Sequence, residues 1–85
     1  PSGAAASRGK ESAEEARRRR ARLRAAEAAV LKAEKELGEI DAELAEPETY
    51  ADRAALNRLL DRRTDVERCL KREYAAWERL VDEEA

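Results

Sequence analysis

The chain has 85 residues, of which 45% are charged and 4% aromatic, and its net charge at pH 7 is −2. This length allows two helices side by side, but not a thick core around an enclosed catalytic cleft. Ala, Glu, Arg and Leu dominate, which is typical of long or coiled helices. With no His and one Cys, imidazole catalysis, the usual zinc sites and an internal disulfide are excluded. We therefore expect a non-enzymatic chain without a cofactor.

The single cysteine, Cys69, fits a reducing environment, and its neighbours supply neither a base nor a metal partner. We expect it to be a small residue beside the helix contact rather than a reactive thiol. No stretch approaches the roughly 20 apolar residues of a membrane span. We therefore expect a cytoplasmic protein without a membrane partner. The first residue is Pro rather than Met, so we also expect a fragment of a longer protein.

Residues 1–11 are rich in Ser, Gly and Ala, with a few scattered charges. This composition cannot bury enough surface to become ordered, so we expect a disordered linker or a cloning remnant. Ser12 and Glu15 then have the spacing of a capping box, in which each side chain bonds a free backbone N–H at the helix start. The first helix is therefore predicted from about residue 12 to residue 46.

Apolar residues recur at alternating spacings of three and four in two tracts. The first tract is Leu23, Ala26, Val30, Ala33, Leu37, Ile40 and Leu44. The second tract, with two polar members, is Leu56, Leu59, Arg63, Val66, Leu70, Glu73, Trp77 and Leu80. Such a row is a coiled-coil seam, through which two helices pack. The pattern predicts an all-α fold, a two-helix antiparallel coiled-coil hairpin, with the second helix over residues 52–82 and a frayed end at residues 83–85.

The break between the tracts has a local cause at Pro47. Proline has no N–H for a helical hydrogen bond, and it drives Glu46 toward an extended conformation. We predict a turn over residues 47–51. Asp52 is one candidate N-cap of the second helix, and Thr49 is the other, which would move the start by one turn.

The two tracts can pair in two antiparallel registers seven residues apart. The first register sets Leu44 beside Leu59, Ala33 beside Leu70, Ala26 beside Trp77 and Leu23 beside Leu80. The second sets Ile40 beside Leu56, Leu37 beside Leu59 and Arg19 beside Trp77. We prefer the first register because large side chains meet small ones in it, as close packing requires.

Two charged residues, Arg63 and Glu73, occupy seam positions. Long side chains can lie along a seam and carry their charge out to water. Alternatively, these two residues fix the register, or they reduce the apolar contact between the two helices so that a partner can bind. The sequence alone leaves both interpretations open.

Charge is strongly segregated along the chain. Residues 17–24 hold six arginines and no acid, residues 36–52 hold seven acids and no base, and residues 53–72 hold seven bases against three acids. The hairpin should therefore be acidic at its tip and basic toward its stem. The six arginines spread around more than one side of the first helix, so several should stay free of the second helix. Free guanidinium groups bind phosphates, and this binding releases counterions from the nucleic acid. The alternative interpretation is that these arginines form a solvated surface without a ligand.

The candidate nucleic-acid-binding residues are bases toward the stem and one aromatic side chain: Arg17, Arg18, Arg19, Arg20, Arg22, Arg24, Arg68, Lys71, Arg72 and Tyr74. Tyr74 and Trp77 could stack on an unpaired base, although Trp77 belongs to the seam. Tyr50 is expected to plug the tip of the hairpin.

Two motifs carry a family resemblance: Leu44-Ala45-Glu46-Pro47-Glu48-Thr49-Tyr50, followed by Leu56 and Leu59, and Tyr74-Ala75-Ala76-Trp77-Glu78-Arg79-Leu80. Over roughly residues 12–82 the chain resembles the C-terminal coiled-coil domain of ABC-F ATPases of the Uup type. That domain has an acidic residue, Pro, two residues and Tyr at its turn, and Tyr, two residues, Trp and Glu near its end. Glu46 stands here for the commoner Asp, Arg replaces Lys at many basic positions, and the tip is unusually acidic.

The resemblance implies a domain that follows two ATP-binding cassettes in the same chain and binds nucleic acid while the cassettes hydrolyse ATP. DNA is the first expected partner, with RNA or the ribosome as further ones, and binding is expected at the stem. With the seam closed within one chain, the domain is expected to be a monomer. Two alternatives remain: a purely structural or self-associating coiled coil, and the tRNA-binding arm of an aminoacyl-tRNA synthetase.

Overall fold

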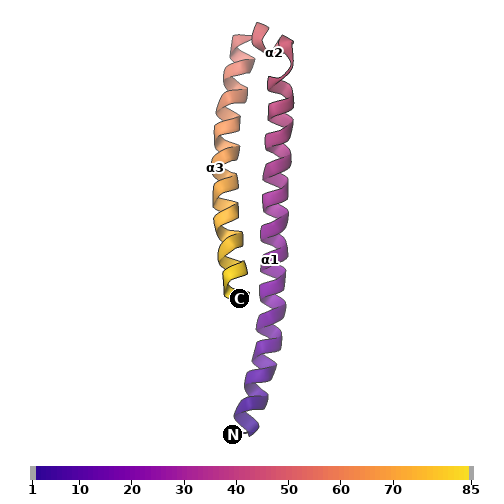
Figure 1. Cartoon of the computed structure of the whole chain (residues 1–85), viewed down its shortest axis with the longest axis vertical. Coiled ribbons are helices and arrows are strands. Elements are labelled where there is room, and N and C mark those ends of the chain that lie inside the picture. The colour runs from indigo at the N-terminus through magenta and orange to yellow at the C-terminus, as the bar shows by residue number, and fades with distance from the viewer. Residues whose placement is uncertain (1, 85) are drawn as a thin grey trace.

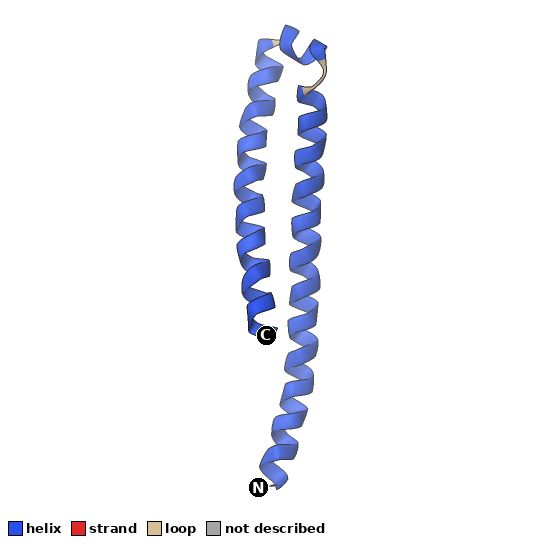
Figure 2. Cartoon of the chain, viewed as in Figure 1, coloured by secondary structure: helices blue, strands red, loops and turns tan. Residues whose placement is uncertain are grey.

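A computed structural model of the protein is a hairpin of two long antiparallel helices joined through a short one (Figure 1). The helices are α1 (Ser2–Leu44), α2 (Pro47–Ala51) and α3 (Arg53–Glu84). The structure describes the backbone of residues 2–84 and the side chains of residues 12–83. Over this part every element is a helix, as Figure 2 shows, and the predicted all-α antiparallel hairpin is confirmed. The rod measures 73 × 17 × 14 Å.

The seam between α1 and α3 follows the two predicted tracts. Its buried members are Ala26, Val30, Ala33, Ile40 and Val66, and the leucines of the two tracts are half-buried. Within residues 12–83, only one large side chain, Ile40, is almost fully covered, at 2% exposure. Two helices can shield only a narrow strip from water, so most of the surface is available for contacts with other molecules.

The cross-helix contacts follow the first of the two predicted registers. Arg63 bonds Asp41, and Trp77 bonds Glu27 and lines a groove with Val30. The second register would have set Trp77 beside Arg19 instead. The preferred register is therefore confirmed, and its physical basis is the fit of large side chains of α3 against alanines of α1.

α1 begins earlier than the sequence predicted. Its backbone is helical from Ser2, so residues 2–11, expected to be a disordered linker, continue the helix beyond the end of α3 (Figure 1). The predicted capping box at Ser12 therefore lies inside the helix. Once a helix exists, adding one residue costs little, and the alanines of this segment are the best helix formers. Pro1 lies outside the described residues.

The tip contains a short helix, Pro47–Ala51, where the sequence predicted a turn over residues 47–51. Glu46 is extended (φ −76°, ψ 126°) and Pro47 is the first residue of α2, because proline fits the first helical position, where no N–H is needed. The Thr49 hydroxyl donates a 2.6 Å hydrogen bond to the carbonyl oxygen of Glu43, near the end of α1. Tyr50, expected to plug the tip, is 60% exposed instead.

α3 begins with a cap that the sequence had offered as one of two candidates. The Asp52 carboxylate accepts the backbone N–H of Ala55 at 3.1 Å, so Asp52 rather than Thr49 is the N-cap. α3 then runs through Glu84, two residues beyond the predicted end. Of the predicted frayed segment 83–85, Ala85 lies outside the described residues. None of the three helices, over the described residues, has an apolar stretch that could span a bilayer.

Candidate nucleic-acid interface

The hairpin has two broad faces, one on each side of the plane that contains α1 and α3. Residues seven apart lie on the same side of a coiled-coil helix, which assigns each residue to a face. We call one the Tyr74 face, which has a shallow groove lined by Glu27, Val30, Leu31, Tyr74 and Trp77. The other is the Cys69 face, which has a groove lined by Ala29, Lys32, Ala33, Glu36, Val66, Cys69 and Glu73.

The six arginines of residues 17–24, here called the stem arginines, are divided between these faces. Arg20 lies seven residues before Glu27, so Arg20, Arg17 and Arg24 belong to the Tyr74 face. Arg22 lies seven residues before Ala29, so Arg22 and Arg18 belong to the Cys69 face. The remaining member, Arg19, extends the seam and is half-buried, whereas the other five are exposed. The predicted cluster therefore exists, but it surrounds the helix rather than forming one flat patch.

Nearby acidic side chains neutralise only part of the positive charge of the stem arginines. Glu15 and Glu83 line a groove together with Arg18, Arg19 and Arg22. Among the described side chains, the only ion pair of the six stem arginines joins Arg18 to Glu14 at 3.8 Å, with both side chains largely exposed. An exposed pair of this kind is worth less than about 1 kcal/mol. Most of the positive charge of the stem is therefore available to an external anion.

The predicted bases of α3 do not join the stem arginines. In the observed register Lys71 lies across from residues near Lys32, about 12 residues from the middle of the stem arginines, or roughly 18 Å along the helix axis. Arg68 points away from the seam, Lys71 lies at the outer edge of the Tyr74 face, and Arg72 lies at the outer edge of the Cys69 face. These exposed bases therefore form a separate, looser group.

Sequence reasoning missed one base of the stem. Arg79 lies seven residues after Arg72, so it is on the Cys69 face, and the register sets it across from residues near Arg24. It is exposed and on the same face as Arg18 and Arg22. The seven-residue spacing was visible in the sequence, but only the register reveals which part of α1 lies beside Arg79.

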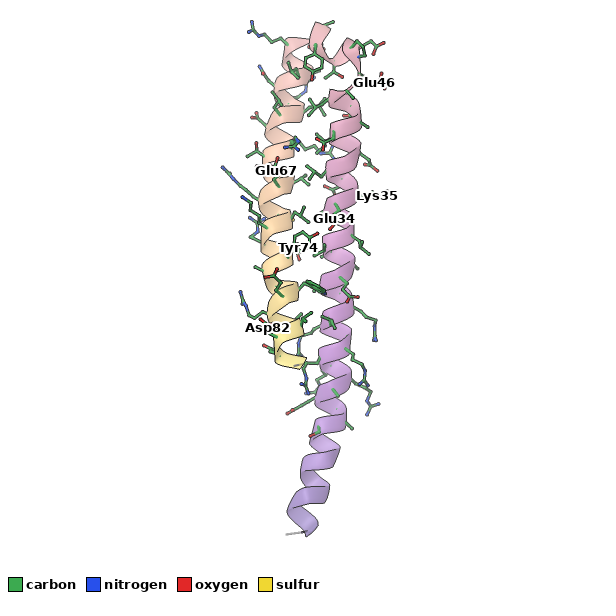
Figure 3. All side chains as sticks on the ribbon, in the orientation of Figure 1. Glu34, Lys35, Glu46, Glu67, Tyr74 and Asp82 are labelled. Carbon is green, nitrogen blue, oxygen red and sulfur yellow. The ribbon has the colours of Figure 1, made fainter. Side chains whose placement is uncertain are left out.

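Tyr74 was predicted to stack on an unpaired base, and it lies on the same face as three stem arginines. Its side chain, however, is hydrogen-bonded to a glutamate of α1. Its hydroxyl donates a hydrogen bond to Glu34, and Figure 3 shows the two side chains reaching toward one another between α3 and α1. This hydrogen bond, followed by desolvation and the charge of Glu34, raises the pKa of Tyr74 above its ordinary value. Trp77 Nε1 donates to Glu27 at 3.3 Å. Carboxylates beside both rings would repel a phosphate, so stacking here is disfavoured.

Arg63 shows how a charged residue is accommodated in the seam. Its Nε donates a 2.6 Å hydrogen bond to Asp41 of α1, and its Nη1 donates to Glu67 one turn along α3. The bond to Asp41 is the main reason that the pKa of Arg63 is raised, so this guanidinium keeps its charge. The side chain runs out of the seam, as expected for a long stem, and it also ties the two helices together in their register. Glu73, the other charged seam residue, is half-buried in the Cys69-face groove.

The tip is less uniformly acidic than the sequence suggested. Arg58 and Arg62 of α3 line a groove with Glu43 and Glu46. These bases follow the acidic segment in sequence, and the hairpin folds them back onto it. The Cys69 face of the tip therefore carries both signs of charge.

Over the described residues, no group of three or more acidic or cysteine side chains is arranged to hold a metal ion.

Cys69 is a free, half-buried thiol beside Ala33 and Val66, in agreement with its expected role as a small residue next to the seam.

Comparisons of the chain with protein-family models, with curated proteins and with solved structures gave no match. The resemblance to the coiled-coil domain of ABC-F ATPases therefore depends on the turn motif and the Tyr-Trp motif alone.

Proposed function

We propose that this hairpin is a non-catalytic nucleic-acid-binding domain that contacts DNA phosphates through its stem arginines. The observation that carries the proposal is the exposure of Arg17, Arg18, Arg20, Arg22 and Arg24, of which only Arg18 has an ion-pair partner among the described side chains. Such uncompensated guanidinium groups attract phosphates and displace the counterions condensed on DNA. Their distribution around α1 suits binding to backbone phosphates rather than reading of base sequence.

The turn and Tyr-Trp motifs support a second, more specific part of the proposal. The hairpin would be the C-terminal domain of a Uup-type ABC-F ATPase, joined to two ATP-binding cassettes that hydrolyse ATP. In such a protein the hairpin adds affinity for nucleic acid, and the ribosome is a further candidate partner. Two nucleotide-binding motifs upstream in the full-length sequence would support this assignment, and a synthetase core there would refute it.

The experiment compares the salt dependence of DNA binding between the chain and a variant with Arg18, Arg20 and Arg22 replaced by Gln. Gln keeps helix propensity close to that of Arg, so helicity should be unchanged. The loss of three phosphate contacts should weaken binding and reduce the slope of log K against log salt by about 2 to 3. Fluorescence anisotropy with single-stranded, duplex and branched DNA, and with RNA, measures both quantities.

A matched control replaces Arg53, Arg58 and Arg62 by Gln, which removes the same charge near the tip. This control should change the slope much less, because two of the three bases, Arg58 and Arg62, lie beside acids of the tip. If both variants lose affinity equally, overall charge rather than the stem explains binding. If the unmodified chain shows no salt-sensitive binding to any of the four nucleic acids, the proposed function is wrong.

A further inference from the structure

Exposed apolar side chains gather on one face of the hairpin. Apart from Tyr50 at the tip, the large apolar residues that are exposed among the described side chains are Leu31 at 64%, Leu60 at 45%, Tyr74 at 38% and Val81 at 37%. Leu31 and Tyr74 line the same groove. Leu60 and Val81 lie 14 residues before and seven residues after Tyr74, which puts them on the same side of α3. All four therefore belong to the Tyr74 face.

The seam does not account for these residues, because they lie outside the row that packs α1 against α3. Single exposed leucines are common on protein surfaces, but a collection on one face marks an interaction site. The groove between Leu31, Tyr74 and Trp77 is also a surface into which another helix could pack. A partner that covers the Tyr74 face would therefore bury apolar surface that the hairpin leaves in water.

We propose that the partner is a second copy of this chain, bound antiparallel through the Tyr74 face to form a four-helix bundle. A two-fold axis that crosses the hairpin between Glu67 and Tyr74 sets α3 against α3 and α1 against α1. The row Leu60, Glu67, Tyr74 and Val81 is evenly spaced about that point, so Leu60 meets Val81 of the second copy. Glu67 likewise meets Tyr74 of the second copy.

Charge on the α1 side of the face favours this antiparallel orientation. Arg17, Arg20 and Arg24 occupy its stem end, whereas Glu34 and Asp41 lie nearer the tip. The proposed axis brings Arg24 close to Asp41 of the second copy. A parallel pair related by a two-fold axis would instead set α3 against α1. The apolar row of α3 would then face the charged row of α1 in the second copy, which is Arg20, Glu27, Glu34 and Asp41.

The available area is sufficient for a specific dimer. α1 and α3 are paired over about 26 residues, or roughly 39 Å, and two adjacent helices are about 20 Å wide. The face thus offers on the order of 800 Å² per copy, which is the standard size for stable interfaces. The sequence predicted a monomer because its seam is satisfied within one chain. The proposal differs because it concerns the neighbouring row, and it does not depend on nucleic-acid binding. Because Arg17, Arg20 and Arg24 lie on the face that the dimer covers, DNA and the second copy would compete for them.

The test is sedimentation of the 85-residue chain, without nucleic acid, over a range of concentrations at low salt. The mass should rise from one chain to two as concentration increases. The single variants Leu60→Glu and Val81→Lys should each remain monomeric, because a charge then faces an apolar residue. An equimolar mixture of the two variants should recover the dimer, because the carboxylate introduced in one chain then faces the ammonium group introduced in the other. In a parallel dimer this mixture would not associate.

Two further variants test whether association depends on the Tyr74 face. Leu31→Glu, at the most exposed of these positions, should also abolish the dimer, since it adds a carboxylate close to Glu34 of the second copy. The matched control Ala76→Glu adds the same charge to the Cys69 face and should leave the dimer intact. Circular dichroism checks that every variant stays helical. A wild-type mass of one chain up to about 1 mM, or equal dissociation by Ala76→Glu, would overturn the proposal.

Discussion

Arg63 shows that a charged residue in an apolar row need not weaken the fold. Its aliphatic stem lies in the seam, and its guanidinium reaches Asp41 across the hairpin and Glu67 along its own helix. These exposed charges contribute little energy by themselves, but they are satisfied together only when α1 and α3 are in the observed register. The residue therefore contributes to the specificity of pairing more than to the free energy of unfolding.

Gly38 is a residue at which stability can be gained. It lies inside α1, and a Cβ added there would meet no atom within 4 Å. The Gly38→Ala variant should therefore be more stable by about 0.5–1 kcal/mol, since Gly is the more costly residue in a helix interior. Thermal unfolding should shift upward by several degrees, at about 4–8 °C per kcal/mol for a domain of this size.

The matched control is Ala42→Gly, at another exposed position of the same helix. It should lose a similar amount of stability. An unchanged or lower unfolding temperature for Gly38→Ala would mean that this position is not a simple helix interior.

At the scale of elements, the tip is organised by local hydrogen bonds between side chains and backbone rather than by a core. Thr49 satisfies a carbonyl near the end of α1, Pro47 starts α2 without needing a donor, and Asp52 caps α3. No residue of α2 is buried. The direction of the chain reversal therefore depends on these caps.

Asp52→Ala should remove the cap of α3 and destabilise the hairpin by about 1 kcal/mol, because the N–H of Ala55 loses its partner. Urea unfolding followed by circular dichroism measures this difference. Asp61→Ala, at an exposed position farther along α3, removes the same charge without touching a cap. That control should lose no stability, and a loss equal to that of Asp52→Ala would point to charge rather than capping.

At the scale of the whole molecule, the thin seam makes each long helix depend on the other. Of the side chains that the structure describes, only five apolar ones are buried. Isolated helices in water are marginal, and most helical stability in proteins comes from packing. The hairpin should therefore form as one unit rather than as two independent helices.

A peptide of residues 1–45 should consequently be much less helical per residue than the whole chain, as measured by circular dichroism. Adding a second peptide of residues 53–84 should increase the helicity beyond the sum of the two. Equal helicity per residue in the first peptide and in the intact chain would show that α1 is helical without packing against α3.

The sequence by itself determined the two seams, the break at Pro47 and the all-α hairpin, because helical periodicity and the missing N–H of proline are local properties of the chain. It also located the stem arginines. It could not determine that α1 continues to Ser2, since linker-like composition and helix propagation compete there. Nor could it decide that Arg79 joins the stem, that Tyr74 bonds Glu34, or that Leu31 and Tyr74 share a groove. These depend on the register and on which side of each helix stays uncovered, and both are decided only when all pairs along the two helices pack together.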